Sequence, residues 1–385
     1  MHMDPEMPML VGVIFAILIV GMVLRLLRQP SVVAYIIVGV LLGPFALQVI
    51  TDTDLASRLG AMGVVMLLFF VGMETDPSTL KGNWRIAVGG TLFQIALSMV
   101  AVWLVSLFFS WPINRVILLG FVISLSSTAV IIKLLQDGEI LDSKVGQGVL
   151  SILLAQDLAI VPMLLSLNFM GGGVEFTQII KQIIGGVVLV SLLIWLFSTK
   201  TVQLPFSNSI KSDREIQVFA ALSLCFGFAL LTAWLELSAA FGAFMAGLLV
   251  GVARETEWVS HALEPLQVIF LAIFFVSVGL MLDLHFLYDN AWQVSLLVLA
   301  ALISNTLINA VVLKLSDFSI SDSIYAGFML AQIGEFSFVL AAVGLQAELV
   351  NDSGYQMILS VITVTLFVSP AWIAIGQRII RYHAN

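Results

Sequence analysis

The sequence predicts an all-α integral membrane protein of about 13 transmembrane helices, arranged as two inverted six-helix repeats. Three observations lead to this fold class: the composition, the pattern of apolar segments, and an internal similarity between the two halves of the chain. Of the 385 residues, 60% are hydrophobic and 10% are charged, and the mean hydropathy is +1.10. A soluble fold of this size has too little interior for that much apolar surface. The net charge of −8 comes without a basic patch suited to nucleic acid, so we expect no nucleic-acid partner.

Apolar segments and helix-breaking residues divide the chain into candidate spans, with an error of several residues at each end. The spans cover residues 8–27, 31–50, 57–74, 84–110, 113–136, 146–170, 176–199, 214–235, 238–253, 264–282, 291–315, 322–346 and 353–380. Their odd number puts the termini on opposite sides of the bilayer. With the C-terminus in the cytoplasm, thirteen of the sixteen Lys and Arg residues lie at cytoplasmic ends, and only Arg58, Arg115 and Lys181 lie opposite. The positive-inside rule therefore predicts an outside N-terminus and a cytoplasmic C-terminus.

The two halves of the chain resemble each other at an offset of 208 residues. Three matches share this offset or nearly so: 39–43 with 247–251, 67–76 with 273–283, and Pro162 with Pro370. The offset defines one repeat at about 8–170, a connector helix at about 176–199, and a second repeat at about 214–380. Six spans and a connector reverse the direction of equivalent helices, an arrangement typical of alternating-access transporters. Because the chain ends soon after the last span, we expect a single transport domain over residues 1–385, without a soluble regulatory domain.

Asp157 is the first candidate for the functional site. It is the only charged residue from Val145 to Gly173, and a helix places it about 20 Å from Lys144, near the middle of a bilayer core about 30 Å thick. An unpaired carboxylate there costs several kcal/mol or more, so it needs partners or a proton. The alternative is a protonated acid that serves only a helix contact.

Two spans carry polar interruptions at matching positions. Residues 124–129 read Ser-Leu-Ser-Ser-Thr-Ala, and an offset of 208 from Ser126 leads to Gly334 in the segment Ala331-Gln-Ile-Gly-Glu-Phe-Ser. Paired breaks in the fifth and twelfth helices of inverted halves point to a binding site at the bilayer midplane. Small polar residues that mediate helix packing are the alternative. In the second segment, Gln332, Gly334 and Glu335 are candidate supporting residues, and Asn305 belongs to the same supporting set. Glu335 either binds the ion, carries a proton or compensates the half-helix dipoles, and we favour the last role.

These residues offer the ligands that hard monovalent cations prefer. A carboxylate and hydroxyls are available from Asp157, Ser126, Ser127 and Thr128, and we place the cation at Asp157, Ser127 and Thr128. Gln156 belongs to the same candidate set. Because adjacent helical residues do not share a face, its amide is expected to brace the crossing segments rather than bind the ion directly. Pro162 frees a backbone carbonyl near Leu158.

These motifs resemble the monovalent cation:proton antiporter-2 family. The resemblance rests on 124–129, on Ala155-Gln-Asp157 and on 331–336, together with the glycines at 39 and 43 and the segment 70–76. It covers essentially the whole chain and is closest to the glutathione-gated potassium-efflux (Kef) branch, in which Gln-Asp replaces the Asn-Asp or Asp-Asp pair of sodium-selective relatives.

The resemblance implies a sodium/proton antiporter-like fold and a homodimer in the bacterial inner membrane. It implies K⁺/H⁺ exchange, or potassium efflux, by an elevator-type motion in which a proton and a cation compete for Asp157. Relatives in this branch carry a C-terminal nucleotide-binding regulatory domain, so the chain is expected to be a truncated or stand-alone transport domain. Many relatives place a lysine where Asn305 aligns, so Asp157 lacks that charge partner here. With one strongly placed carboxylate on its helix, we expect electroneutral one-for-one exchange.

Other functions stay open at this stage. A Na⁺/H⁺ antiporter uses the same residue types, and selectivity between K⁺ and Na⁺ depends on cavity size and ligand number. An organic-anion symporter needs a basic residue or a half-helix N-terminus that faces the substrate, and the sequence shows no buried Arg or Lys at the midplane. A channel-like cation conduit needs currents far above carrier turnover. An intramembrane diacid protease built on Asp157 and Glu335 has no use for the hydroxyl-rich break. We therefore expect a transporter rather than an enzyme, with no cofactor beyond the transported ions.

Overall fold

The computed structural model describes most of the chain as helix. It covers residues 7–27, 29–74, 85–109, 111–137, 139–141, 143–171, 214–235, 237, 239–252 and 257–384, and Lys181, Ile184, Gly185, Val187, Val188 and Ser191. Among these residues the only β-type pairing is a single bridge between Ser126 and Ile333. The predicted all-α class is therefore confirmed. The predicted connector helix at 176–199 lies largely outside the described residues, so the predicted number of helices stays a prediction.

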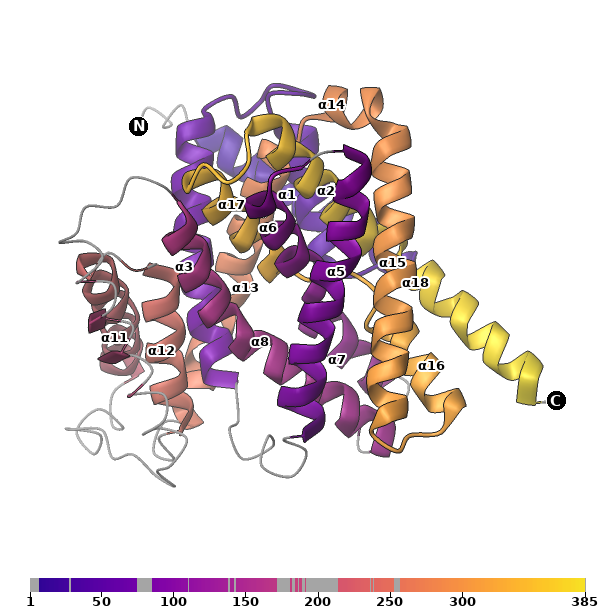
Figure 1. The fold of residues 1–385 in the computed structure, drawn as a ribbon. Helices are drawn as coiled ribbons and strands as arrows, with labels where there is room; N and C mark the ends of the chain where they lie inside the picture. The colour runs from indigo at the N-terminus through magenta and orange to yellow at the C-terminus, as the bar shows by residue number, and fades with distance from the viewer. Residues whose placement is uncertain are drawn as a thin grey trace, which may run out of the picture. The chain divides into compact units, whose positions relative to one another are not determined.

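The chain divides into two compact units, which we describe separately. Unit 1 consists of Met1–Ala56, Asn83–Met163 and Phe275–Asn385, and unit 2 of Ser57–Gly82 and Leu164–Phe274. The helices of unit 1 are α1 (Met7–Leu26), α2 (Ser31–Leu42), η1 (Arg85–Gly90), α5 (Thr91–Phe109), α6 (Ile113–Ser124), α7 (Thr128–Asp137), α14 (Leu284–Asp289), α15 (Ala291–Leu315), α16 (Ile320–Met329), α17 (Phe336–Gln346) and α18 (Asp352–Ala384) (Figure 1). Those of unit 2 are most of α3 (Thr53–Glu74), α11 (Arg214–Trp234) and α12 (Ala239–Val252), and α8 (Lys144–Met170) and α13 (Glu257–Met281) contribute to both units.

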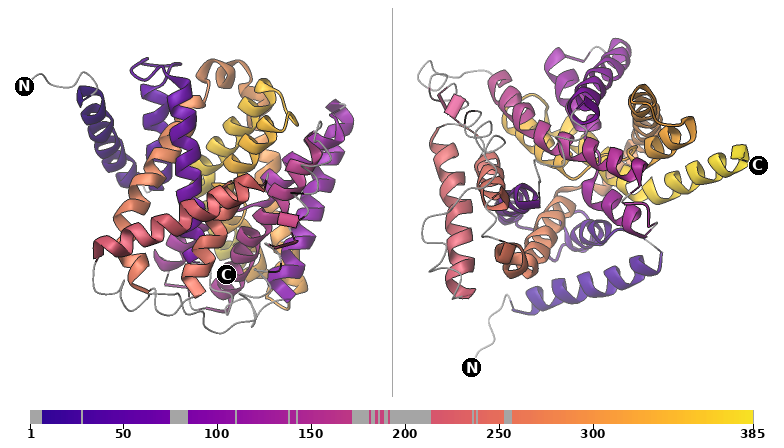
Figure 2. Two further views of the ribbon diagram at one scale, coloured as in Figure 1. Left: turned by 90° about the vertical axis from the view of Figure 1, so that its left-hand side faces the viewer. Right: turned by 90° about the horizontal axis from the view of Figure 1, so that it is seen from below.

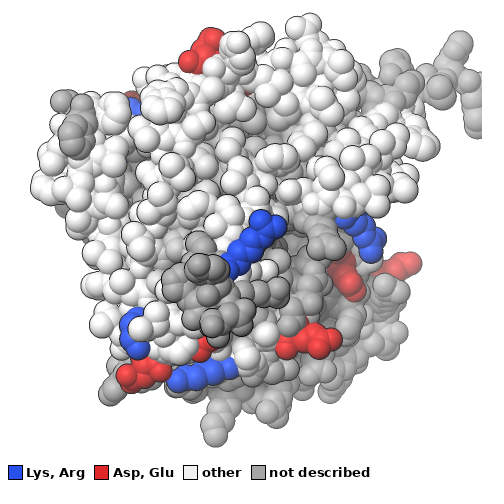
Figure 3. Space-filling model, turned by 90° about the vertical axis from the view of Figure 1, so that its right-hand side faces the viewer, with Lys and Arg blue, Asp and Glu red and all other residues white. Residues whose placement is uncertain are grey.

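Six helices of the described part are long and apolar enough to cross a membrane, by length and composition. They run over Ile86–Leu107, Lys144–Leu167, Glu215–Trp234, Leu263–Met281, Ala291–Leu315 and Asp352–Arg378. Figure 3 shows a face on which charged side chains gather mainly toward the lower part, below a broad zone without Lys, Arg, Asp or Glu. Large apolar side chains such as Leu299 and Leu307 of α15 are exposed. An exposed apolar surface of this extent fits a surface that contacts lipid.

The predicted spans and the observed helices differ where turn chemistry ends a helix early. The span 31–50 ends at Leu42, because Pro44 disfavours a helical conformation at Gly43, and the chain then folds back so that Ile50 N donates to Leu42 O. The short helix α14 was not predicted. Its start is fixed by Asp283, whose side chain accepts hydrogen bonds from the backbone of His285 and Phe286.

One apolar cluster in unit 1 joins the half-helices α7 and α16 to α8 and α15. Its fully buried members come from α7, α8, α15 and α16, among them Ile131, Ile152, Leu313 and Met329. At the edge of the unit, α1 packs against α2 through Ile17 (Figure 2). The cluster gives the broken helices a close-packed support, which a polar site in a membrane requires.

Glycines bring the helix backbones together in two equivalent places. In unit 1, a Cβ atom on Gly39 of α2 would lie 2.9 Å from Cα of Gly279 in α13. In unit 2, a Cβ atom on Gly72 of α3 would lie 3.0 Å from Cα of Gly247 in α12. Gly39 corresponds to Gly247, and Gly72 to Gly279, at the offset of the sequence repeat or within one residue of it. The same small-residue contact thus recurs with the roles of the two halves exchanged, as an internal two-fold repeat requires; the repeat bounds themselves stay a prediction.

Candidate ion-binding site at the crossing of two broken helices

The two predicted interruptions are real breaks, and they cross each other inside unit 1. The first separates α6 from α7 between Ser124 and Thr128, and the second separates α16 from α17 between Met329 and Phe336. The segments between the half-helices pair through the Ser126–Ile333 bridge. Gly334 N also donates a hydrogen bond to Leu125 O, with an N–O distance of 2.8 Å. The crossing therefore gives each segment backbone partners that a broken helix would otherwise lack within a membrane.

Gly334 is the residue that permits this close approach. A Cβ atom at position 334 would lie 2.5 Å from the carbonyl oxygen of Ser126 and 2.6 Å from its carbonyl carbon. Both atoms belong to the backbone of the opposite segment, so they cannot move aside as a flexible side chain would. The close approach thus depends on the missing side chain of Gly334. Its supporting role at the ion site stays a prediction.

The C-terminal carbonyl groups of the two half-helices are satisfied by side chains from elsewhere. Asn305 of α15 donates its amide to Ile123 O at 2.7 Å and to Ala331 O at 3.1 Å, so one side chain serves both helix ends. Ser337 donates to Val122 O at 2.6 Å, and Ser126 Oγ donates to Leu330 O at 2.8 Å. A neutral amide therefore lies where the negative ends of two helix dipoles meet.

Gln156 braces the break in the first helix through a chain of amides. Its Oε1 accepts from Ser126 N at 2.9 Å, and its Nε2 donates to Gln94 Oε1 at 2.7 Å. Gln94 Nε2 in turn donates to Ser124 O at 3.0 Å. Both glutamines are almost fully buried. These bonds fit the bracing role expected for Gln156, whereas sequence reasoning missed Gln94, although it is the only amide side chain deep in the apolar segment that became α5.

The amide chain can be tested through stability. Gln156→Leu leaves the Ser126 N–H and the Gln94 amide buried without these partners, and each such loss costs about 1–3 kcal/mol. We expect a clearly lower thermal midpoint for the detergent-purified variant. Gln94→Leu should also lower it, but the double variant should lose less than the sum of the two, because it removes both members of one hydrogen bond. Strictly additive losses would mean that the two amides act independently.

Asp157 faces the hydroxyl at the start of α7. Thr128 Oγ1 lies 3.1 Å from Oδ1 and 3.2 Å from Oδ2 of the carboxylate, whose residue is only 3% exposed. Ser127 precedes this helix, and its Oγ accepts from Val130 N at 3.4 Å, in the manner of a helix N-cap. The carboxylate is thus placed beside the positive end of a half-helix dipole, which favours a negative charge there.

The second break holds buried polar atoms without hydrogen-bond partners. Gln332 is fully buried, and neither atom of its amide has a partner; the same holds for Oδ1 of Asn305 and Oδ1 of Asn309. Glu335 is 6% exposed and stands directly before α17. Buried amides without partners are uncommon, and a water molecule or an ion is their usual complement. Among the described residues, no three His, Cys, Asp or Glu side chains cluster as they would around a multivalent metal.

Comparison with known proteins identifies the family of the chain. Residues 13–375 match the family model described as the transmembrane sodium/hydrogen exchanger. The chain belongs to this family. The antiporter-family membership predicted from the motifs is therefore confirmed, and the relatives named below are transporters rather than enzymes.

Among the relatives, the iron transporter MagA of Paramagnetospirillum magneticum is 33% identical and aligns with 99% of this chain and 88% of its own length. K(+) efflux antiporter 5 of Arabidopsis thaliana is 31% identical, and the alignment covers 94% of this chain and 65% of that relative. The putative cation/proton antiporter YbaL of Escherichia coli is 28% identical over 98% of this chain and 69% of its own length. The sodium proton antiporter MjNhaP1 of Methanocaldococcus jannaschii shares the fold, with a TM-score of 0.74 over 96% of this chain and 98% of that one, at 17% identity.

Proposed function

We propose that the chain exchanges a monovalent cation for protons across a bacterial inner membrane, with K⁺ preferred over Na⁺ and Asp157 binding either the cation or a proton. The observation that carries the proposal is the pairing of the buried Asp157 carboxylate with the Thr128 hydroxyl at a helix break. A carboxylate that can lose its proton, next to a hydroxyl oxygen, suits a hard cation. The preference for K⁺ rests on the Gln156-Asp157 pair and on the name of the Arabidopsis relative.

The mechanism requires the site to open alternately to the two sides. Inverted repeats give inward- and outward-facing states of similar energy. We propose an elevator-type motion in a homodimer, with the N-terminus outside and the C-terminus in the cytoplasm. Competition at Asp157 supplies the coupling, because a cation binds only after the proton has left. One carboxylate binds either one proton or one monovalent cation, and each of them neutralises it. Exchange is then electroneutral, with one cation for one proton.

The proposal is tested by proton efflux from proteoliposomes titrated with K⁺, Na⁺ and Rb⁺. We expect all three to drive efflux, with K⁺ half-saturating at the lowest concentration. Fe²⁺ forms a separate arm, because one relative is named an iron transporter. Efflux driven by Fe²⁺ alone would replace the proposal with divalent-metal transport. One-for-one exchange of singly charged ions moves no net charge across the membrane. A membrane current that depends on transport would therefore refute electroneutrality.

Thr128 supplies a matched test of the ligand set. Thr128→Val keeps the shape of the side chain but removes the hydroxyl beside Asp157. Loss of one such oxygen is worth about 1 kcal/mol, so we expect the half-saturating cation concentration to rise about fivefold. Thr128→Ser retains the hydroxyl and should stay close to wild type. An unchanged half-saturating concentration in Thr128→Val would exclude the hydroxyl as a cation ligand.

A further inference from the structure

Unit 1 contains a pocket beside the crossing. It is an apolar pocket between α5, α6, α15 and α18, with a volume of about 120 Å³. Aliphatic side chains dominate its walls, among them Val102, Leu119 and Leu297. Ser304 also lines it, but its hydroxyl donates to Ala301 O at 3.1 Å within its own helix. The interior of the pocket therefore offers an apolar environment to an occupant.

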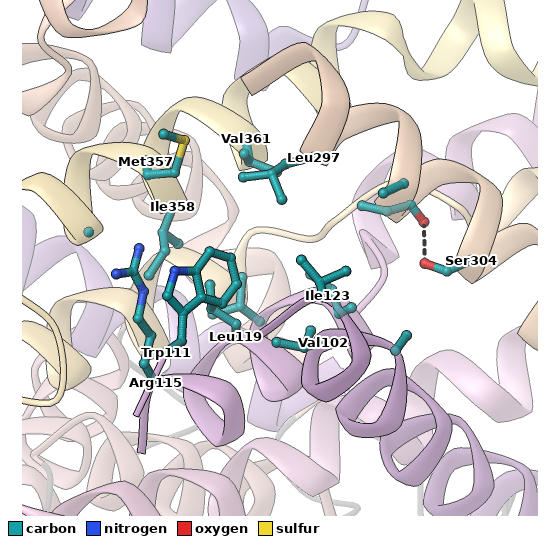
Figure 4. A pocket seen from close by; sticks show the side chains of 16 residues that line it. Val102, Trp111, Arg115, Leu119, Ile123, Leu297, Ser304, Met357, Ile358 and Val361 are labelled. Atoms are coloured by element: carbon teal, nitrogen blue, oxygen red, sulfur yellow. Dashed lines mark hydrogen bonds between the residues drawn. The ribbon is translucent and has the colours of Figure 1, made fainter. Parts of the chain in front are cut away.

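One cation lies at the end of this apolar pocket. Among the described residues that line it, Arg115 is the only charged one. Figure 4 shows Arg115 and Trp111 together at one end and Ser304 at the other. The Arg115 guanidinium carbon lies 4.6 Å from the centre of the Trp111 ring, and the Arg115 Nε atom is buried without a hydrogen-bond partner. A half-buried guanidinium with an unused donor calls for an anion.

The pocket runs from this cation along α6 toward the C-terminal end of that helix. Arg115 lies in the first turn of α6 and Ile123 in its last, so the pocket follows the helix for about 12 Å. Exposed apolar side chains flank it on the neighbouring helices, such as Leu104 of α5 and Leu296 of α15. An amphipathic tryptophan next to the cation is typical of the headgroup level of a bilayer. The charge pattern of the chain predicts that this end lies on the side opposite the cytoplasm.

We infer that this pocket binds an anionic phospholipid, with its phosphate on Arg115 and part of one acyl chain in the apolar interior. A cavity of about 150 Å³ holds a benzene-sized group, so a volume of about 120 Å³ admits a short stretch of chain and not a whole lipid. The remaining hydrocarbon lies along the exposed aliphatic surface of α5 and α15. Charge complementarity selects an anionic headgroup, because a zwitterionic one brings its own cation close to Arg115.

The occupant would also support the crossing. Val122 and Ile123 line the pocket, and their carbonyl groups accept the hydrogen bonds from Ser337 and Asn305. A chain that fills the pocket packs against this last turn of α6. Bound lipid should therefore raise the thermal midpoint of the protein, whether or not the protein transports K⁺.

The experiment measures lipid binding to the delipidated protein by native mass spectrometry. The probes are dioleoyl-phosphatidylglycerol and dioleoyl-phosphatidylcholine at equal concentration. We expect wild type to retain the anionic lipid about tenfold better and to be stabilised by it against heat. Arg115→Gln should lose this preference, and Ala300→Phe, which adds bulk to a residue lining the pocket, should lose retention of both lipids. Arg58→Gln removes an exposed cation that does not line the pocket and should behave as wild type.

Two results would overturn the inference. Equal retention of the two lipids by wild type would leave a non-selective crevice for hydrocarbon. An undiminished preference in Arg115→Gln would place the headgroup elsewhere. Because the assay involves no ion gradient, either result stands apart from the outcome for cation exchange.

Discussion

Asp157→Asn is expected to abolish pH-coupled cation flux in proteoliposomes while leaving the fold intact. Asparagine has nearly the same shape and can still contact the Thr128 hydroxyl, which lies 3.1 Å from Oδ1 of the carboxylate. The asparagine side chain carries no charge and no titratable proton at physiological pH, so it can neither neutralise a cation nor release a proton for it. We expect flux at the level of empty liposomes and a thermal midpoint close to that of wild type.

A matched control separates the site from a general loss of negative charge. Asp289 is an exposed acid at the end of α14, and Asp289→Asn should transport as wild type does. Full activity of Asp157→Asn would remove the central claim. Loss of both flux and fold would shift the role of Asp157 to a structural one, the alternative that the sequence left open.

Gly334→Ala is expected to have the second largest effect, through the crossing itself. The added methyl group would meet the Ser126 backbone at 2.5 Å, so one segment must move away from the other. Such overpacking costs about 1–3 kcal/mol, and here it also strains the Gly334–Leu125 hydrogen bond. We expect a lower thermal midpoint, and a severe loss of flux because Ser126 and Thr128 belong to the same short break.

The control for this variant is Gly227→Ala in α11. No atom lies within 4 Å of a Cβ atom built at Gly227, which is exposed. Alanine is the better helix former there, so stability should be unchanged or slightly higher. If Gly334→Ala matched this control in both stability and flux, the close approach of the two segments would not matter for transport.

The two helix breaks could be predicted from the sequence because local chemistry and internal symmetry agreed. A cluster of hydroxyls around Ser126 and a flexible polar stretch around Gly334 are each ambiguous alone, since small polar residues also mediate helix packing. Their shared offset made them equivalent, and equivalent breaks in inverted halves meet at one site. The brace formed by Gln156 followed from helical geometry, which turns it away from the face of Asp157.

Other features depend on contacts that a sequence pattern does not encode. Gln94 joins the site only because α5 packs against the break, and no motif marks it. Asn305 entered the candidate site because it aligns with a lysine position of many relatives. Its hydrogen bonds to Ile123 O and Ala331 O, at the ends of two different half-helices, arise from tertiary structure. The pocket at Arg115 likewise arises where α5 and α6 meet α15 and α18, from distant parts of the chain. The sequence analysis used Arg115 only in the count of basic residues.

The most direct test of competition at Asp157 is the release of protons when K⁺ is added to purified protein in weakly buffered detergent solution. We expect about one proton to be released for each K⁺ bound. At pH values below the pKa of the site, the apparent affinity for K⁺ should rise about tenfold for each unit by which the pH is raised. Asp157→Asn should release none. K⁺ binding to wild type with an affinity independent of pH, and without proton release, would contradict the proposal that one carboxylate serves both ions.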